Sequence, residues 1–337
     1  MVVKLIKLGI IGTNWITQRF IDAVKLSQKY ELTTVYSRHE ETARQFAVKN
    51  GASETFTNLD SFFSKGKFDT VYIASPNSLH FEQAEMAIQH GKNLIVEKPA
   101  FSTQKQMAKI QKMLAENPQV LYFEAARNIH TENFHAIEKK LGQLQVVQGA
   151  EFTYSKYSSR YDLVLQGQEP NVFSLKYAGG ALQDLGVYTV YDAVALFGMP
   201  EETAYFPQLI RTGVDGKGTA ILRYPEYNVT LNFSKISNSH MTSEIYGLKD
   251  LIEIDDAGEI NAVIYIDDDN NKQVIGNTID ENPMLPEVED FARVIDDPKN
   301  SQNKKDYDYW LQLSVYVNKL IYNLRQAAHI SFVGEKK

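Results

Sequence analysis

The sequence of 337 residues contains no cysteine. This absence excludes disulfides, thiolate metal sites, iron–sulfur clusters and cysteine nucleophiles. Positive charge is also scarce, because 35 Lys and Arg stand against 42 Asp and Glu. The net charge of −7 argues against nucleic acid or an anionic membrane as the main partner. No stretch approaches the ~18 uninterrupted apolar residues that span a bilayer, and no signal-peptide pattern is seen, so we expect a cytoplasmic protein.

Several chemical motifs are missing as well. There is no His-Glu-x-x-His sequence, and His130 and His135 are five residues apart, which fits no usual helical metal pair. We therefore predict no metal. The Gly-x-Ser-x-Gly turn of serine hydrolases is absent too.

The first third of the chain alternates short apolar runs with helical patterns, from Leu5 to Glu124. The runs at 71–74 and 94–96 are almost entirely apolar, as is typical of strands covered on both faces. Strands that alternate with helices of this length indicate βαβ units and a parallel sheet. We predict an α/β domain over residues 1–124.

After about residue 145 the pattern changes to successive strands joined by turns, from Val146 to Ile266. Helical stretches are predicted at Gly180–Leu196 and Tyr307–Arg325, with a polar loop over Asp296–Asp306 before the second. A run of strands without helices between them indicates an antiparallel sheet. We predict an α+β domain with a large, mostly antiparallel open sheet over residues 125–337.

A glycine turn lies where the first strand passes into the first helix. Gly12 opens a G-x-G-x-x-G/A frame, but Asn14 stands at the second glycine position and Thr17 at the third. Asn tolerates positive φ better than most residues, so a phosphate-binding turn at a helix N-terminus remains feasible. The predicted cofactor-binding residues in this turn are Gly12, Thr13, Asn14, Trp15 and Ile16.

The end of the second strand provides an independent test. An NAD site is expected to carry an Asp or Glu there, which binds the ribose 2′-hydroxyl. This strand ends in Ser37 and Arg38 instead. A hydroxyl and a guanidinium suit a 2′-phosphate, so we predict NADP(H) in preference to NAD(H).

Three further segments complete a recognisable set: Ala74–His80, Glu97-Lys98-Pro99, and Gly179–Tyr188 with its Gly-Gly-x-Leu-x-Asp-x-Gly pattern. In this order the chain resembles the glucose–fructose oxidoreductase/inositol dehydrogenase (Gfo/Idh/MocA) family over nearly its whole length. Many members have His at the position of Tyr188. With Tyr there, the chain is most similar to the branch that contains dihydrodiol dehydrogenase and anhydrofructose reductase.

The resemblance implies a Rossmann domain followed by a substrate and oligomerisation domain, with nicotinamide between them. It places Lys98 and Tyr188 at the substrate carbon, and it places Ser75, Pro76, Asn77, His80 and Glu97, with Lys98, along the cofactor. Members often carry an Arg-Phe-x-Pro-like segment at Phe123–His130, which this chain lacks.

The chemistry is consistent with these assignments. Interconverting a secondary alcohol and a carbonyl of a sugar, polyol or cyclic diol needs a hydride partner and a proton shuttle. Asp184 and Tyr188 are four residues apart, so on a helix they share one face. In our preferred scheme Tyr188 moves the proton, Lys98 polarises the oxygen and favours the ionised phenol, and Asp184 orients the substrate or the lysine. The exchange of roles between Lys98 and Tyr188 stays open.

Three predictions are less specific. Tyr157 and Arg160 belong to a segment rich in tyrosine that could line the substrate pocket or form a polar loop, and we add His130 to the predicted substrate contacts. A sheet with one uncovered face predicts a homodimer or homotetramer. The alternative function is a non-catalytic NAD(P)-binding sensor with the same fold.

Overall fold

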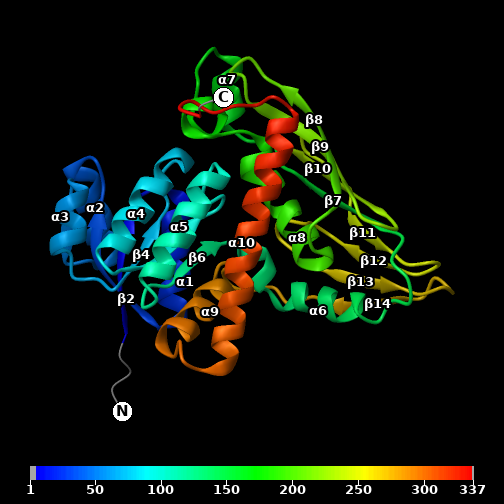
Figure 1. The fold of residues 1–337 in the computed structure, drawn as a ribbon, viewed down its shortest axis with the longest axis horizontal. Helices are drawn as coiled ribbons and strands as arrows, with labels where there is room; N and C mark the ends of the chain where they lie inside the picture. The colour runs from blue at the N-terminus through cyan, green and yellow to red at the C-terminus, as the bar shows by residue number, and fades with distance from the viewer. Residues whose placement is uncertain (1–4, 336–337) are drawn as a thin grey trace. The chain divides into compact units, whose positions relative to one another are not determined.

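The computed structural model describes residues 5–335, which divide into two units (Figure 1). Unit 1 comprises the chain up to Ala125 together with residues 280–314. Unit 2 comprises residues 126–279 and the chain from Val315 onward. The first boundary lies next to the predicted one, but residues 280–314 belong with unit 1 and not, as predicted, with the carboxy-terminal domain.

Unit 1 is built on a six-stranded parallel sheet with the order β3-β2-β1-β4-β5-β6. Its strands are β1 (Ile6–Ile11), β2 (Tyr30–Tyr36), β3 (Glu54–Phe56), β4 (Thr70–Ile73), β5 (Asn93–Glu97) and β6 (Tyr122–Ala125). The strand order reverses between β1 and β4, and open α/β sheets bind their ligands at such a switch point. The predicted α/β domain is confirmed.

The connecting helices of unit 1 follow the predicted pattern closely. They are α1 (Trp15–Ser27), α2 (Glu40–Asn50), α3 (Leu59–Lys65), α4 (His80–Gln89) and α5 (Gln104–Glu116), with a single 3-10 turn, η1 (Asn77–Leu79), before α4. The apolar side of each helix is buried, as Phe20, Ile21 and Val24 of α1 illustrate. Figure 1 shows these helices around the sheet.

Helix α9 (Leu285–Asp296) completes this unit from a distant part of the sequence. Val288 and Phe291 join the same buried cluster as the first strands, and the Phe291 ring stacks on Phe123 of β6 with 4.7 Å between centroids. The Tyr30 hydroxyl donates to the Val288 carbonyl at 3.1 Å. These apolar contacts explain why residues 280–314 pack with unit 1.

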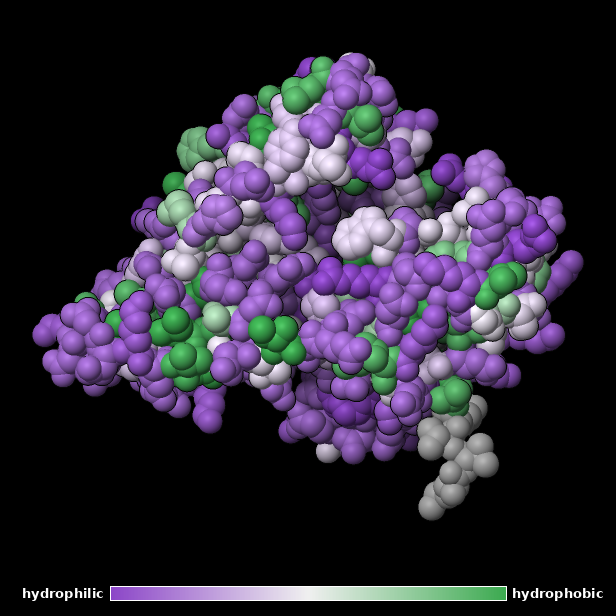
Figure 2. Space-filling model, turned by 180° about the vertical axis from the view of Figure 1, so that it is seen from behind, coloured by the Kyte–Doolittle hydropathy of each residue, from purple (hydrophilic) through white to green (hydrophobic). Residues whose placement is uncertain are grey.

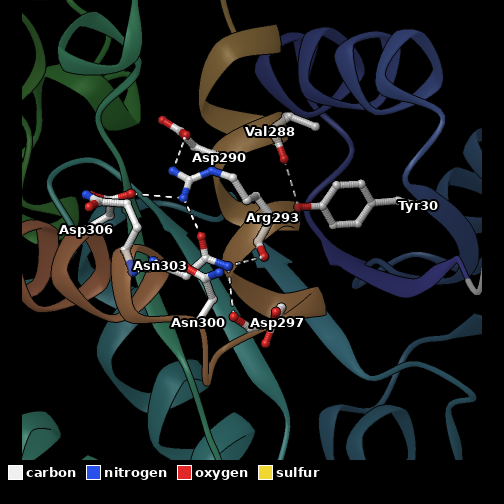
Figure 3. Close-up of polar contacts among 9 residues, drawn as sticks. Tyr30, Val288, Asp290, Arg293, Asp297, Asn300, Asn303 and Asp306 are labelled. Carbon is white, nitrogen blue, oxygen red and sulfur yellow. Dashed lines mark hydrogen bonds and ion pairs between the residues drawn. The ribbon is translucent and has the colours of Figure 1, made fainter.

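The predicted loop Asp296–Asp306 is mostly helical, because α10 (Ser301–Ala327) begins inside it. Figure 3 shows the reason. Asn303 donates to the carbonyls of Arg293 and Asp297 and closes the short connection, while Arg293 pairs with Asp306 at 2.9 Å. The polar residues that indicated a loop therefore cap and brace two helix ends.

Unit 2 contains an eight-stranded sheet with the order β14-β13-β12-β11-β7-β10-β9-β8. Neighbouring strands are antiparallel except for the parallel pair β7 and β10. The strands are β7 (Gly149–Ser155), β8 (Glu202–Leu209), β9 (Asp215–Arg223), β10 (Asn228–Ser234), β11 (Ser243–Tyr246), β12 (Leu251–Ile254), β13 (Val263–Ile266) and β14 (Lys272–Gly276). All but β14 were predicted, with shifted bounds.

The helices of unit 2 are η2 (Arg127–His130), α6 (Glu132–Leu141), α7 (Arg160–Leu165), η3 (Asn171–Phe173), η4 (Leu175–Tyr177), η5 (Leu182–Gly186) and α8 (Val187–Phe197). Among them, α8 contacts β7 and β10, and α6 contacts β14 (Figure 1). The helix predicted at Gly180–Leu196 is thus a π-turn, η5, that continues into α8.

Large exposed apolar side chains are scattered on the surface. On the face in Figure 2 the hydrophobic groups are small and separated by hydrophilic surface. Across residues 5–335, no helix has both the length and the apolar character needed to cross a membrane.

Candidate functional site

The turn after β1 can pack against the loop after β4 only because its first residue is glycine. Gly12 has a φ of +107°, and a Cβ atom there would lie 2.6 Å from the carbonyl oxygen of Ala74. A side chain at this position would therefore clash with the loop that follows β4. The turn lies at the sheet's switch point and at the N-terminus of α1, which is where a pyrophosphate binds in this architecture.

Asn14 explains why the second glycine of the pattern is dispensable here. Its backbone is extended, and its side-chain oxygen accepts from the amides of Ile16 at 2.9 Å and Thr17 at 3.2 Å. Its amide nitrogen donates to the Ala74 carbonyl at 2.9 Å. Asn14 thus caps α1 and joins two switch-point loops, while the Ile16 amide is already engaged by this cap.

The end of β2 lies beside this turn. The Gly12 amide donates to the carbonyl of Tyr36, the last residue of β2, at 3.4 Å. Ser37 is half-buried and Arg38 is exposed. Burial raises the pKa of Tyr36 while the Arg38 guanidinium opposes this, so the guanidinium lies near the phenol. The residues present fit a nicotinamide dinucleotide.

His80 lies behind the loops that were predicted to contact the cofactor. It is fully buried, with Nε2 at 2.8 Å from the Ser75 carbonyl and Nδ1 at 3.3 Å from the Pro99 carbonyl. Burial lowers its pKa to about 4, so the ring is neutral at pH 7. This geometry suits a residue that positions the loops after β4 and β5.

The Glu97-Lys98-Pro99 triplet begins at the last residue of β5 and is held by hydrogen bonds from neighbouring strands. Glu97 is buried, and its carboxylate accepts from the Tyr72 hydroxyl at 2.6 Å. Lys98 is half-buried, and its peptide bond to Pro99 is cis. Beyond the triplet, the Ala100 amide donates to Glu124 at 2.9 Å. Lys98 directly follows the last residue of β5 and therefore lies at the carboxyl edge of the sheet.

In unit 2, Tyr188 lies in the first turn of α8 and is 7% exposed. The guanidinium of Arg127 lies over its ring at 5.3 Å, and the ring of Tyr154 meets it edge-on at 5.4 Å. Burial alone lowers the pKa of Arg127, but Tyr188, Tyr154 and Glu259 outweigh it and raise the value overall. Arg127 also pairs with Glu259 at 3.1 Å.

Arg127 and Asn128 are functional candidates that the sequence reasoning missed. Asn128 donates to the Tyr188 carbonyl at 3.4 Å and to Asp192 at 2.8 Å, and burial raises the pKa of Asp192 well above its usual range. Only His130 of this stretch was predicted, because the Arg-Phe-x-Pro-like segment of the family is missing here. The arginine and asparagine in that stretch were the available signal.

Asp184 lies in η5 and forms an ion pair with Lys235, the residue after β10. The Lys235 side chain is 5% exposed and that of Asp184 is 34% exposed. Sequence reasoning gave Asp184 either the substrate or Lys98 as partner. Within unit 2 its partner is Lys235, which sequence reasoning did not identify because a lysine at a strand end is usually exposed.

The double glycine before η5 makes room for a buried carboxylate. Gly180 has a φ of +126°, and a Cβ there would lie 2.1 Å from Asp215. Asp215 accepts from the Leu182 amide at 2.6 Å and from the Tyr205 hydroxyl at 2.7 Å. Burial raises the pKa of Asp215 against these hydrogen bonds. Asp215 thus anchors the start of the segment that carries Asp184 and Tyr188.

The remaining predicted substrate contacts all belong to unit 2. Tyr157 is 37% exposed and its hydroxyl donates to Asp162 of α7 at 2.6 Å, whereas Arg160 is exposed at the start of that helix. His130 is buried in η2. Residues 5–335 contain no group of three His, Asp or Glu side chains placed to hold a metal ion.

The structure therefore assembles two half-sites. Unit 1 brings together the turn at Gly12, the end of β2 and the Lys98 loop, whereas unit 2 brings together Tyr188, Arg127 and the pair of Asp184 with Lys235. The convergence of Lys98 with Tyr188 across the two units stays a prediction.

Comparison with known proteins agrees with this geometry. Residues 6–125 match the family model described as "Oxidoreductase family, NAD-binding Rossmann fold", and residues 137–253 match the GFO/IDH/MocA C-terminal domain. An uncharacterized oxidoreductase of Escherichia coli, YgjR, is 38% identical over 87% of this chain and 89% of its own. The scyllo-inositol 2-dehydrogenase (NADP(+)) IolU of Bacillus subtilis is 36% identical over 90% of this chain and 92% of its own.

Among solved structures, the 3-ketoreductase KijD10 of Actinomadura kijaniata in complex with NADP and TDP-benzene has the same fold. Its TM-score is 0.84 at 19% identity, over 96% of this chain and 98% of that one.

A parallel sheet with a glycine turn at its switch point, joined to a large open-sheet unit, defines a two-domain NAD(P)-dependent oxidoreductase. The chain belongs to the Gfo/Idh/MocA family. The predicted family, and the predicted enzyme class acting on CH–OH groups, are confirmed.

Proposed function

We propose that this protein is an NADP(H)-dependent dehydrogenase of a cyclic polyol of the inositol type. One observation carries the proposal: β2 is followed directly by Ser37 and Arg38 without an acidic residue, in a chain that is 36% identical to an NADP-dependent scyllo-inositol 2-dehydrogenase. A guanidinium and a hydroxyl bind a 2′-phosphate, whereas an NAD site carries a carboxylate at this place.

The residues of unit 1 would hold the dinucleotide. The turn at 12–16 and the N-terminus of α1 face the pyrophosphate, Ser37 and Arg38 bind the 2′-phosphate, and residues 75–77 with Glu97 follow the nicotinamide half. When bound, the nicotinamide supplies the hydride acceptor or donor.

The residues of unit 2 would act on the substrate. Tyr188 exchanges the proton of the reacting hydroxyl, and the Arg127 guanidinium at 5.3 Å from its ring stabilises negative charge on the oxygens beside it. Lys98 polarises the reacting oxygen, and Asp184 accepts a hydrogen bond from a neighbouring hydroxyl of the substrate. The exchanged assignment, with Lys98 as acid and base, remains the alternative.

Replacement of the lysine tests catalysis directly. Lys98→Ala should abolish NADP⁺ reduction with a panel of inositols, aldoses and cyclic diols while NADPH still binds. Binding can be followed through Trp15, which is 70% exposed beside the phosphate turn. Unchanged turnover would refute the mechanism, and tight NADPH binding by a wild type that turns over no panel member would favour the sensor.

Cofactor choice is tested at the end of β2. Arg38→Ala should weaken NADP⁺ binding by about ten- to a hundredfold and leave NAD⁺ binding unchanged, since a hydrogen bond to a charged group is worth ~1.5–3 kcal/mol. Arg44→Ala, an exposed arginine on α2, serves as the control. Equal losses for both cofactors would contradict the assignment.

We also propose a homodimer through the face of the eight-stranded sheet opposite α6 and α8, with a homotetramer as the larger alternative. Within the described residues, that face carries a hollow of about 370 Å³ lined by side chains that include Phe206 and Met241, which are 64% and 63% exposed. Phe206→Asp should produce monomers in light scattering. A monomeric wild type would remove the proposal. The cytoplasmic location stays a prediction.

A further inference from the structure

Lys235 is held in place by its backbone as well as by its side chain. Its amide donates to the Gly216 carbonyl at 2.8 Å, and its carbonyl accepts from the Ser158 amide at 2.9 Å. The backbone of Lys235 therefore cannot move away from Ser158 and Gly216 without breaking these two hydrogen bonds. Its fixed position distinguishes it from an ordinary surface lysine.

The ammonium of Lys235 is among the few buried cations in the described chain, since only 5% of the side chain is exposed. It binds Oδ2 of Asp184 and lies 5.4 Å from the centre of the Phe173 ring. A buried ammonium is costly unless it is paired and hydrogen-bonded. The pair with Asp184 is therefore integral to this part of unit 2.

The two partners differ in access. Asp184 keeps 34% of its side chain exposed, whereas Lys235 lies beneath it. A carboxylate offers about four acceptor positions, which is more than one ammonium occupies. The buried lysine thus fixes the carboxylate on its inner side, while part of the carboxylate stays accessible from the surface.

We propose that Lys235 is a positioning residue for the substrate: it orients the Asp184 carboxylate so that this group accepts a hydrogen bond from a substrate hydroxyl. The inference rests on the proposed function and deepens it. It makes Asp184 a neutralised acceptor in an ion pair, which suits an uncharged polyol better than an anionic sugar.

The test compares Lys235→Met, Lys235→Arg, Asp184→Asn and the double variant in the full chain, with Lys249→Met as an exposed-lysine control. KM and kcat are measured with whichever panel polyol the wild type turns over, and NADPH affinity is measured alongside. Lys235→Met should raise KM about tenfold or more with a smaller change in kcat, because a hydrogen bond to a charged group loses its geometry. Lys235→Arg should restore KM to within about threefold, and NADPH affinity should not change.

The double variant separates positioning from general stability. Once Asp184→Asn has removed the charge, adding Lys235→Met should not raise KM further, and this comparison stays valid if Lys235→Met alone fails to fold. A wild-type KM in Lys235→Met, or effects that multiply in the double variant, would overturn the inference. A wild type without activity on any panel member defeats the proposed function instead. Non-additive melting temperatures of the four proteins would then still support the pair, and additive ones would refute it.

Discussion

At the scale of single residues, His80 illustrates how a buried imidazole can support two loops. Its two ring nitrogens face the carbonyls of Ser75 and Pro99, so one imidazole spans the loops after β4 and β5. A neutral ring has only one N–H and donates to one of them, while the buried site opposes the second proton. The sequence shows that a histidine stands here, but only the buried environment determines which groups its ring nitrogens face.

This environment predicts a pH dependence of stability. The pKa of His80 is 6.5 when exposed and about 4 in the fold, so the unfolded chain binds more protons between these values and stability falls as the pH falls. The loss between pH 7.5 and pH 5 should be about 2 kcal/mol from this residue. Urea unfolding at the two pH values measures it.

Comparison of variants isolates this contribution. The raised pKa values of Asp192 and Asp215 act in the opposite direction, but they are common to wild type and variant. His80→Asn should lose the His80 part of the slope, and His39→Asn, at an exposed site, should keep it. Equal slopes for wild type and His80→Asn would contradict the prediction.

At the scale of elements, the segment that carries Asp184 and Tyr188 departs from a regular helix. It starts with the π-turn η5. Such turns are rare in proteins, and those that occur are often found at functional sites. Its start depends on Gly180, whose positive φ and missing side chain admit the Asp215 carboxylate. The Gly-Gly-x-Leu-x-Asp pattern is thus a packing requirement as well as a family signature.

Gly180→Ala should lower the free energy of unfolding by about 2–5 kcal/mol, from backbone strain together with displacement of the Asp215 carboxylate. Gly167→Ala is a matched control, because Gly167 also has a positive φ, of +90°, but no atom lies within 4 Å of its Cβ position. It should lose only about 1–2 kcal/mol. Thermal or urea unfolding measures both, and equal losses would show that the carboxylate plays no part.

At the scale of the whole molecule, unit 1 is assembled from two distant stretches of chain. The strands of its sheet lie within residues 6–125, but α9 supplies Val288 and Phe291 to its buried cluster. The cofactor-binding half therefore depends on residues near the end of the sequence.

Phe291→Ala should lower the free energy of unfolding of unit 1 by about 3–5 kcal/mol, since the side chain is 1% exposed and stacks on Phe123. Val48→Ala, at a position 79% exposed on α2, should change it by less than about 0.5 kcal/mol. Both tryptophans, Trp15 and Trp310, lie in this unit, so their fluorescence follows its unfolding. A loss below 1 kcal/mol, on the order of a surface substitution, would contradict the composite unit.

The predictable part of the fold was the part governed by local pattern. Helix α1 illustrates this, because its apolar spacing and its cap at Asn14 are both local. Helix α9 and strand β14 were missed. The polar stretch before α10 was taken for a loop because Asn303 and Arg293 satisfy helix ends only through contacts that the sequence does not reveal.

The sequence by itself determined the periodic elements, the glycine turn and the family, because spacing and composition are properties of neighbouring residues. The tertiary structure decided that Asp184 binds Lys235, that Arg127 lies over Tyr188 and that α9 belongs to unit 1. Each of these depends on which distant side chains burial brings together, and a buried charge takes the partner that the fold places beside it.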